Sequence, residues 1–395
     1  MKNKICIYKI SYILIIFYLF FSYIDTKLII FPLLGTFIVA SLAILNNDLN
    51  IHLNSDLIIW YCFLLSCFFT LLYSDKKKEA ILFIFVFFIF MFLKEMFMNL
   101  PEIGNFIVVI FMFFSSIHVI ATLAQFFIPN LVIIVNQSIL PSDLLNINLF
   151  QLKSGRFAGI TGQTGANAFF ISIFIGTILV KIRESQHLIK SILYIVAMTV
   201  AFFCLFLTDK RGMLVFTIIS IFLVIMINIY SESKKYFWSI AIISSLIALL
   251  LFLVLATLRV IDFSNFKDLS TGRSDLYQVM AKMIDNNVFL GNGFGSVVNT
   301  LGIKGHNIYL QLFAEQGIFS VLIFILAVIN TFYLSVKSHL LIPKIIDNSK
   351  IIFGIYVQSI FILYGLTGNP LYDYFILGVY LLVTGLPLSF LYNRK

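Results

Sequence analysis

The sequence has few charged residues. Only 11% of its 395 residues are charged, whereas soluble domains carry about 25%, so a water-soluble enzyme is excluded. The 45 phenylalanines and the 16% aromatic content also exclude a disordered chain, which could not solvate so much apolar surface. The mean hydropathy is +1.04, and the apolar runs are continuous rather than alternating, which argues against a β-barrel. The composition therefore predicts an integral membrane protein made of helices.

Several chemical signatures are missing as well. The four cysteines (Cys6, Cys62, Cys67 and Cys204) lie in or beside apolar runs without pairing or metal-ligand spacing, so they are read as small core residues. There is no Gly-x-Ser-x-Gly elbow, no His-Glu-x-x-His and no Asp-x-Asp pair to hold a divalent cation for a nucleotide sugar. We therefore expect neither a metal nor another cofactor.

Twelve apolar runs predict an all-α, polytopic transmembrane helix bundle. The candidate spans are 8–24, 28–45, 57–73, 80–98, 105–128, 166–182, 189–207, 212–230, 237–258, 317–336, 351–368 and 375–391. The first run lacks a small-x-small cleavage site and is read as a retained span. Four parts are expected: N-terminal spans (1–128), central spans with an outer loop at 129–165 (129–258), a long outer loop with short amphipathic helices (259–316) and C-terminal spans (317–395).

The positive charge has no basic soluble domain in which to gather. The net charge is +9, but the chain offers no stacking platform for bases, so nucleic acid is not an expected partner. With both termini inside, the two long loops fall on the outer side. Lys76, Lys77 and Lys78 then also fall outside, against the usual bias. Ionisable residues within the spans are few, namely Lys94, Glu95 and His118, whereas transporters concentrate such groups at mid-membrane.

Four basic residues stand among turn-forming residues at expected outer helix ends. They are Arg156, Arg211, Arg273 and His306. Each arginine alone could merely reach towards lipid phosphates. The alternative is that the guanidinium groups converge on a pyrophosphate and that the imidazole removes a proton from a sugar hydroxyl.

The 259–316 segment is the most informative loop. Ser274 or Asp275 can cap an amphipathic helix that continues to Ile284. Gly291–Gly295 does not have the spacing of a dinucleotide fingerprint and is interpreted as a flexible turn. His306 should open a short helical stretch ending at Gly317. Glu315 lies about 180° from His306 on such a helix, so we expect it to pair with a loop base or to cap locally.

These motifs together resemble the O-antigen ligase/polymerase superfamily, most closely its polymerases of O-antigen or capsule repeat units. The resemblance covers about residues 150–340 and rests on Arg156-Phe157-Ala158-Gly159, Asp209-Lys210-Arg211-Gly212, Gly272-Arg273, Phe289-Leu290-Gly291-Asn292-Gly293-Phe294-Gly295, Gly305-His306-Asn307-Ile308-Tyr309-Leu310 and Glu315-Gln316-Gly317.

The resemblance implies a metal-independent glycosyltransferase of the bacterial inner membrane with a periplasmic active site. Such a polymerase joins undecaprenyl-pyrophosphate-linked repeat units, moving the growing chain en bloc onto the next unit. It implies the lipid-linked donor and acceptor, the bilayer and a chain-length regulator protein as partners. Alternatives are a ligase that transfers polymer to the lipid A core, and a flippase. The roles implied are catalysis by His306, pyrophosphate binding by Arg211, Arg273 and Arg156, and support from Lys210, Tyr309 and Glu315.

Overall fold

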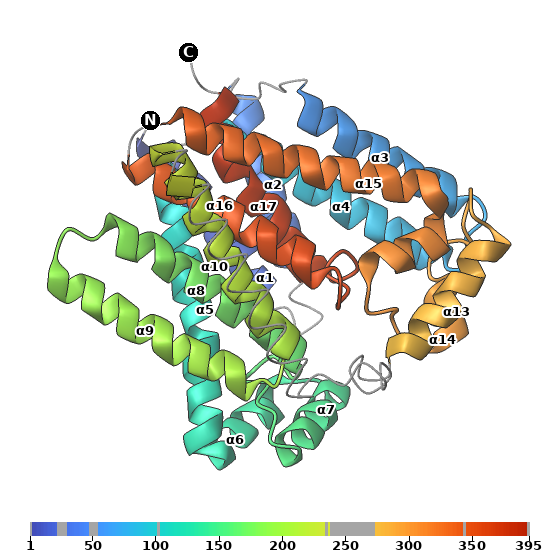
Figure 1. Cartoon of the computed structure of the whole chain (residues 1–395), viewed down its shortest axis with the longest axis horizontal. Helices are drawn as coiled ribbons and strands as arrows, with labels where there is room; N and C mark the ends of the chain where they lie inside the picture. Colours follow the sequence, from blue (N-terminus) through green and yellow to red (C-terminus); the bar gives the residue numbers. More distant parts are fainter. Residues whose placement is uncertain are drawn as a thin grey trace.

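The computed structural model describes residues 2–21, 30–46, 54–100, 103–233, 236–237, 273–342 and 345–392. These residues form helices and connecting turns, with no strand among them, which confirms the predicted all-α fold (Figure 1). The helices are α1 (Lys2–Phe21), α2 (Ile30–Leu45), α3 (Ser55–Leu71), α4 (Lys77–Met98), α5 (Gly104–Phe127), α6 (Pro129–Ile139), α7 (Ser142–Lys153), α8 (Thr164–Glu184), α9 (Leu188–Leu207), α10 (Arg211–Glu232), α13 (Arg273–Asn286), α14 (Ser296–Leu301), α15 (Ile308–Leu341), α16 (Ile345–Tyr364) and α17 (Tyr374–Tyr392).

Within the described part of the chain, seven helices are long and apolar enough to cross a membrane. They are α4, α5, α8, α9, α10, α15 and α17, and α1, α2, α3 and α16 contain shorter apolar helices. These helices coincide with eleven of the predicted spans. The remaining predicted span, 237–258, lies almost wholly outside the described residues.

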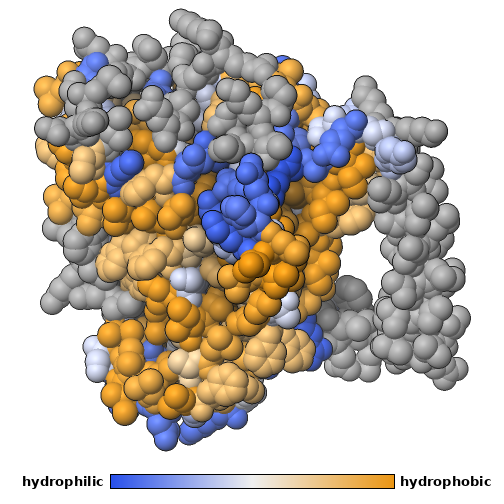
Figure 2. All heavy atoms as spheres, turned by 90° about the vertical axis from the view of Figure 1, so that its left-hand side faces the viewer, coloured by the Kyte–Doolittle hydropathy of each residue, from blue (hydrophilic) through white to orange (hydrophobic). Residues whose placement is uncertain are grey.

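The core forms where helices distant in sequence pack closely. Gly378 and Gly385 of α17 lack side chains where Phe90 and Phe97 of α4 approach, which is how small residues bring membrane helices together. In contrast, α9 exposes large apolar side chains along its length. In Figure 2 such residues form a broad hydrophobic band between hydrophilic residues, as expected of a surface that faces lipid.

The predicted outer loop 129–165 contains two short helices, α6 and α7. Leu131, Ile134 and Val135 of α6 are exposed. Figure 1 shows α6 and α7 beyond the end of α5, where α8 begins and α9 ends.

The described part of the 259–316 segment contains the predicted amphipathic helix as α13, which buries Met280. Residues 259–272 lie outside the described residues. The predicted turn at 291–295 is present, and hydrogen bonds join it to neighbouring segments. The Gly293 amide donates to the carbonyl of Glu315 (2.9 Å), and the Ser74 hydroxyl donates to the carbonyl of Phe294 (2.9 Å). Ser74 precedes Lys76–Lys78, so these lysines lie at the same end of the bundle as the turn.

Helix α15 is interrupted at Gly317, where the sequence analysis ended the short helix. Gly317 has φ 76° and ψ 179°, a conformation essentially restricted to glycine. The carbonyl of Phe289 occupies the place that a side chain would take. The break therefore lets the turn before α14 lie directly on α15.

Candidate functional site

The loop that carries His306 is fixed against the loop between α16 and α17. The Ile308 amide donates to the carbonyl of Gly365 (2.9 Å), and the Lys304 ammonium donates to the carbonyl of Tyr372 (3.2 Å). These bonds join segments about 60 residues apart in sequence. They hold the first turn of α15 and the histidine before it in one position.

His306 itself lies just before the helix start. Its backbone has φ 55°, an uncommon conformation for a residue with a side chain. Asn307 caps α15 by accepting hydrogen bonds from the amides of Tyr309 and Leu310, both at 3.0 Å. The helical stretch predicted after His306 is thus confirmed, with its first residue at Ile308. The Tyr277 hydroxyl of α13 donates to the carbonyl of His306 (3.3 Å).

Positive charges surround the imidazole. Burial lowers the pKa of His306, and the charges of Arg273 and Lys210 lower it further. The charge of Lys304 acts in the same direction. Three cations from α13, from the α9–α10 hairpin and from the histidine's own loop therefore face one half-buried imidazole. Such a group is neutral at neutral pH and can accept a proton.

Lys210 lies at the centre of this group of charges. Burial lowers its pKa, and the charges of Arg273 and then Arg156 lower it further, while Asp209 opposes them. From the sequence, Lys210 was expected to have only a supporting role. In the structure, the charges of Arg156 in the 129–165 loop and of Arg273 in α13 both act on Lys210. Both loops therefore lie at the same end of the bundle.

Asp209 forms ion pairs with both Arg156 and Arg211. The Arg156 Nε lies 3.1 Å from Asp209 Oδ2, and the Arg211 Nε lies 3.6 Å from Asp209 Oδ1. The Arg211 side chain is 92% exposed, so its guanidinium is accessible to a ligand. We call Arg156, Lys210, Arg273 and Lys304 the cationic cluster, with Arg211 at its rim.

A buried polar network holds the Arg156 loop. Gln125 of α5 accepts from the amide of Gly159 (2.7 Å). Asn136 of α6 and Asn148 of α7 donate to the carbonyl of Gly159 (3.0 and 3.3 Å). Sequence reasoning did not identify these residues. The available signal was polar amides placed among apolar helical positions.

The two remaining predicted support residues differ in their surroundings. The Tyr309 hydroxyl donates to the carbonyl of Ile362 in α16 (2.9 Å), so it anchors the helix start. Glu315 is fully buried, and Gln311 Nε2 donates to its Oε1 (3.1 Å). No ion pair of Glu315 occurs among the described residues. Of the two expected alternatives, the carboxylate therefore follows the local one, because it interacts with the backbone of Gly295 and Val297 at the start of α14.

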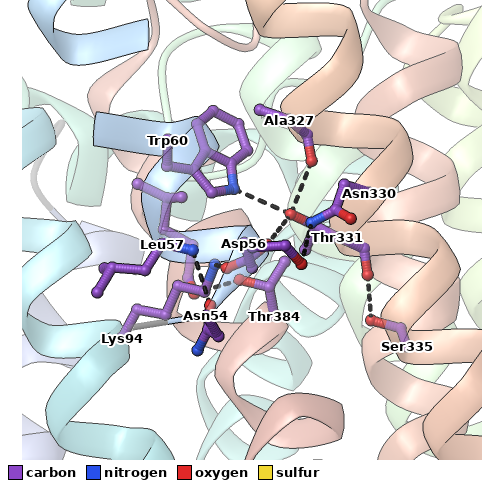
Figure 3. A network of polar contacts seen from close by, with 12 residues as sticks. Asn54, Asp56, Leu57, Trp60, Lys94, Ala327, Asn330, Thr331, Ser335 and Thr384 are labelled. Atoms are coloured by element: carbon purple, nitrogen blue, oxygen red, sulfur yellow. Dashed lines mark hydrogen bonds and ion pairs between the residues drawn. The ribbon is translucent and has the colours of Figure 1, made fainter. Parts of the chain in front are cut away.

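Charged side chains also meet inside the bundle, away from the cationic cluster. Asp56 of α3 and Lys94 of α4 form a fully buried ion pair within the bundle. Thr331 of α15 also donates to Asp56, and Trp60 Nε1 donates to Thr331 (2.9 Å) (Figure 3). Lys94 was expected among the few ionisable residues of the spans, but Asp56 was not, because nothing in the sequence showed that α3 meets α4 and α15 at this point.

A protein-family model matches the part of the chain that contains most of the predicted site residues. Residues 194–325 match the family model described as O-antigen ligase. This match supports the resemblance to the O-antigen ligase/polymerase superfamily. The match runs from α9 into α15, covers about a third of the chain, and includes Lys210, Arg211, Arg273 and His306.

No curated protein matches the chain. The family match and the apolar helices support a multi-pass bacterial membrane protein, and the match supports a membrane function of the O-antigen ligase or polymerase type. Among the described residues, no three histidine, cysteine or acidic side chains are grouped to hold a metal ion.

Proposed function

We propose that the protein polymerises undecaprenyl-pyrophosphate-linked repeat units at the periplasmic face of the inner membrane. The observation that carries this proposal is the cationic cluster around a half-buried, neutral imidazole. The cluster suits a pyrophosphate, and the imidazole suits a sugar hydroxyl. The Arg156 region and the Gly305-His306-Asn307 turn support a polymerase, because the resemblance to polymerases is strongest in these two segments.

In the proposed reaction, Arg273, Lys210 and Arg211 hold the pyrophosphate of the donor. His306 takes the proton of an acceptor hydroxyl, and the hydroxyl oxygen attacks the anomeric carbon of the donor glycan. The bond from that carbon to the pyrophosphate oxygen breaks, and undecaprenyl pyrophosphate leaves with the bonding electrons. Fixed cations stabilise the charge that develops on the leaving group.

In this proposal, binding of the donor also raises the pKa of His306. Cations lower the pKa of His306 in the free protein, and a bound pyrophosphate would offset their charge. The imidazole therefore becomes a stronger base when the donor is present. This order of events limits proton removal to the complex in which a donor is available.

A ligase is the second candidate, favoured by the description of the matched family model. The same cluster and histidine would serve it, because the two reactions share their donor chemistry. They differ in the acceptor, which is the next lipid-linked repeat for a polymerase and the lipid A core for a ligase.

The test is to delete the gene and to separate the surface glycan on a gel. Core with a single repeat identifies a polymerase, and bare core with lipid-linked polymer identifies a ligase. Unchanged glycan, or bare core with repeat units retained on the cytoplasmic side, would refute both.

Complementation then tests the site. His306→Ala and Arg273→Ala should both fail to restore long chains at normal membrane abundance. The first removes a general base, which contributes typically 10²–10⁴-fold, and the second removes a fixed cation that holds the pyrophosphate and stabilises the leaving group. Lys190→Ala is the matched control, since Lys190 is an exposed cation in the first turn of α9, at the opposite end of that helix from Lys210. Long chains from His306→Ala would contradict the mechanism.

A further inference from the structure

The α9–α10 hairpin places a carboxylate among the cations of the site, and the reaction described above gives it no role. Asp209 Oδ2 lies 3.1 Å from Arg156 Nε, and Asp209 Oδ1 lies 3.6 Å from Arg211 Nε. The charge of Asp209 also raises the pKa of Lys210, against the charges of Arg273 and Arg156. One carboxylate therefore faces several of the cations that are proposed to bind an anion.

The backbone of the hairpin fixes the position of Asp209. Its φ is 55°, in the left-handed region that favours glycine and that asparagine and aspartate also adopt. Asp209 directly follows Thr208, the C-cap of α9, and its amide donates to the carbonyl of Phe206 (3.0 Å). The turn therefore forms through backbone contacts, and the ion pairs of the side chain are not needed for it.

The Arg156 loop is also held without the ion pair. The Arg156 amide donates to the carbonyl of Gln151 (2.9 Å), and the Phe157 amide donates to the carbonyl of Leu207 in the last turn of α9 (3.1 Å). The side chains of Arg156 and Asp209 are both exposed, and ion pairs between exposed side chains contribute little to stability. Holding the fold together therefore does not explain the carboxylate at this position.

We propose that Asp209 is an internal counter-anion of the pyrophosphate site. Its carboxylate pairs with Arg156 and Arg211 while the site is empty and gives up these cations when a pyrophosphate binds. Carboxylate and phosphate oxygens are both charged acceptors for guanidinium N–H groups, so the two compete for the same donors. The carboxylate thus lowers the affinity of the site for a pyrophosphate.

The charge change in the proposed reaction gives this competition a use. When the glycosidic bond breaks, the leaving lipid pyrophosphate keeps the bonding electrons and gains one negative charge, while the proton of the acceptor hydroxyl goes to His306. The cations therefore hold the product more strongly than the donor, and product release limits the turnover of many enzymes. Asp209 re-forms its ion pairs as the product leaves, which favours release. This inference rests on the proposed function and adds a release step to it.

The first experiment measures the binding of inorganic pyrophosphate to the full-length protein in detergent by calorimetry. Asp209→Asn removes the charge but keeps the shape of the side chain and tolerates the positive φ. Asp209→Gly keeps the backbone conformation and removes the whole side chain. Both variants should bind pyrophosphate about threefold to tenfold more tightly, as expected when two exposed ion pairs no longer compete with it.

Asp143→Asn is the matched control. Asp143 is an exposed carboxylate in the first turn of α7, at the same end of the bundle. No ion pair of Asp143 occurs in the described part of the chain. Its variant changes the net charge by the same amount, and we expect its affinity for pyrophosphate to equal that of the wild type.

A second experiment tests the role in product release. Glycan transfer from the lipid-linked donor is followed in the presence of added undecaprenyl pyrophosphate. Both Asp209 variants should be inhibited at a concentration about threefold to tenfold lower than the wild type, because the product no longer competes with the carboxylate. A carboxylate that only positions the arginines would have the opposite effect, since its loss would weaken the binding of both pyrophosphates.

Pyrophosphate binding to both Asp209 variants that equals or is weaker than that of the wild type would overturn the inference. Equal tightening by Asp143→Asn would also overturn it, because net charge alone would then explain the result. Tighter pyrophosphate binding with unchanged product inhibition would overturn the role in release. Tighter binding by both Asp209 variants, together with unchanged surface glycan after gene deletion, would support the counter-anion and refute the proposed function instead.

Discussion

Replacing Gly317 by alanine should separate the 287–295 turn from α15. An added Cβ would lie 2.1 Å from the carbonyl oxygen of Phe289 and 2.5 Å from its carbonyl carbon. Both atoms belong to backbone, so no side-chain rotation relieves the contact. The φ of 76° with ψ of 179° is also unfavourable for alanine.

The structure gives the size of the effect. The backbone conformation alone costs about 1–3 kcal/mol for a residue other than glycine. Moving the turn away also breaks the bonds from the Ile318 amide to Val288 and from the Gly293 amide to Glu315, both 2.9 Å. At about 1 kcal/mol for each hydrogen bond, the variant should lose roughly 3–5 kcal/mol of unfolding free energy.

Gly302→Ala is the matched control. Gly302 also has a positive φ, 71°, but nothing lies within 4 Å of the added Cβ, so the cost should be about 1–2 kcal/mol. The assay is the thermal denaturation midpoint of each full-length variant in one detergent, with polymer length on a gel measured in parallel. A midpoint for Gly317→Ala equal to that of Gly302→Ala would refute the packing argument.

Three further predictions follow from the site and the core. Lys304→Gln removes a charge that lowers the pKa of His306, so the pKa of His306 should rise. The acid limb of a kcat/KM profile against pH should then move to higher pH, and a limb that stays or moves to lower pH would contradict the assignment of His306 as the base. Lys94→Met leaves the buried carboxylate of Asp56 without its cation and should lower the free energy of unfolding by about 3–5 kcal/mol. The double variant with Asp56→Leu should recover much of the thermal stability, and an unchanged denaturation midpoint of Lys94→Met would show that the pair contributes little. Gln125→Leu leaves the buried Gly159 amide unpaired and should cost about 1–3 kcal/mol, measured as a lowered denaturation midpoint, and an unchanged midpoint would count against the network.

Local features of the fold could be predicted from the sequence because their causes lie within a few residues. The spans follow from continuous apolar runs, and α13 follows from the apolar spacing after Arg273. The start of α15 and its interruption at Gly317 were expected for the same reason, since Asn307 caps its own helix and glycine alone tolerates the break. The resemblance to the superfamily also used local motifs in a fixed order.

Other features depended on contacts between distant segments. Asp56 meets Lys94 across 38 residues and Thr331 across 275, so no local pattern could reveal that pair. The amides that hold Gly159 come from α5, α6 and α7, which only packing brings together.

The arrangement of charges at the site also depended partly on the local sequence and partly on the tertiary structure. The sequence determined which basic residues lie at helix ends, because turn-forming residues surround them. Only the tertiary structure decided that Lys210 faces His306 while the neighbouring Arg211 lies at the rim, since the α9–α10 hairpin turns the two side chains differently. It also decided that Glu315 is enclosed beside Tyr372 rather than paired with a base, because the break at Gly317 allows the 287–295 turn to cover it.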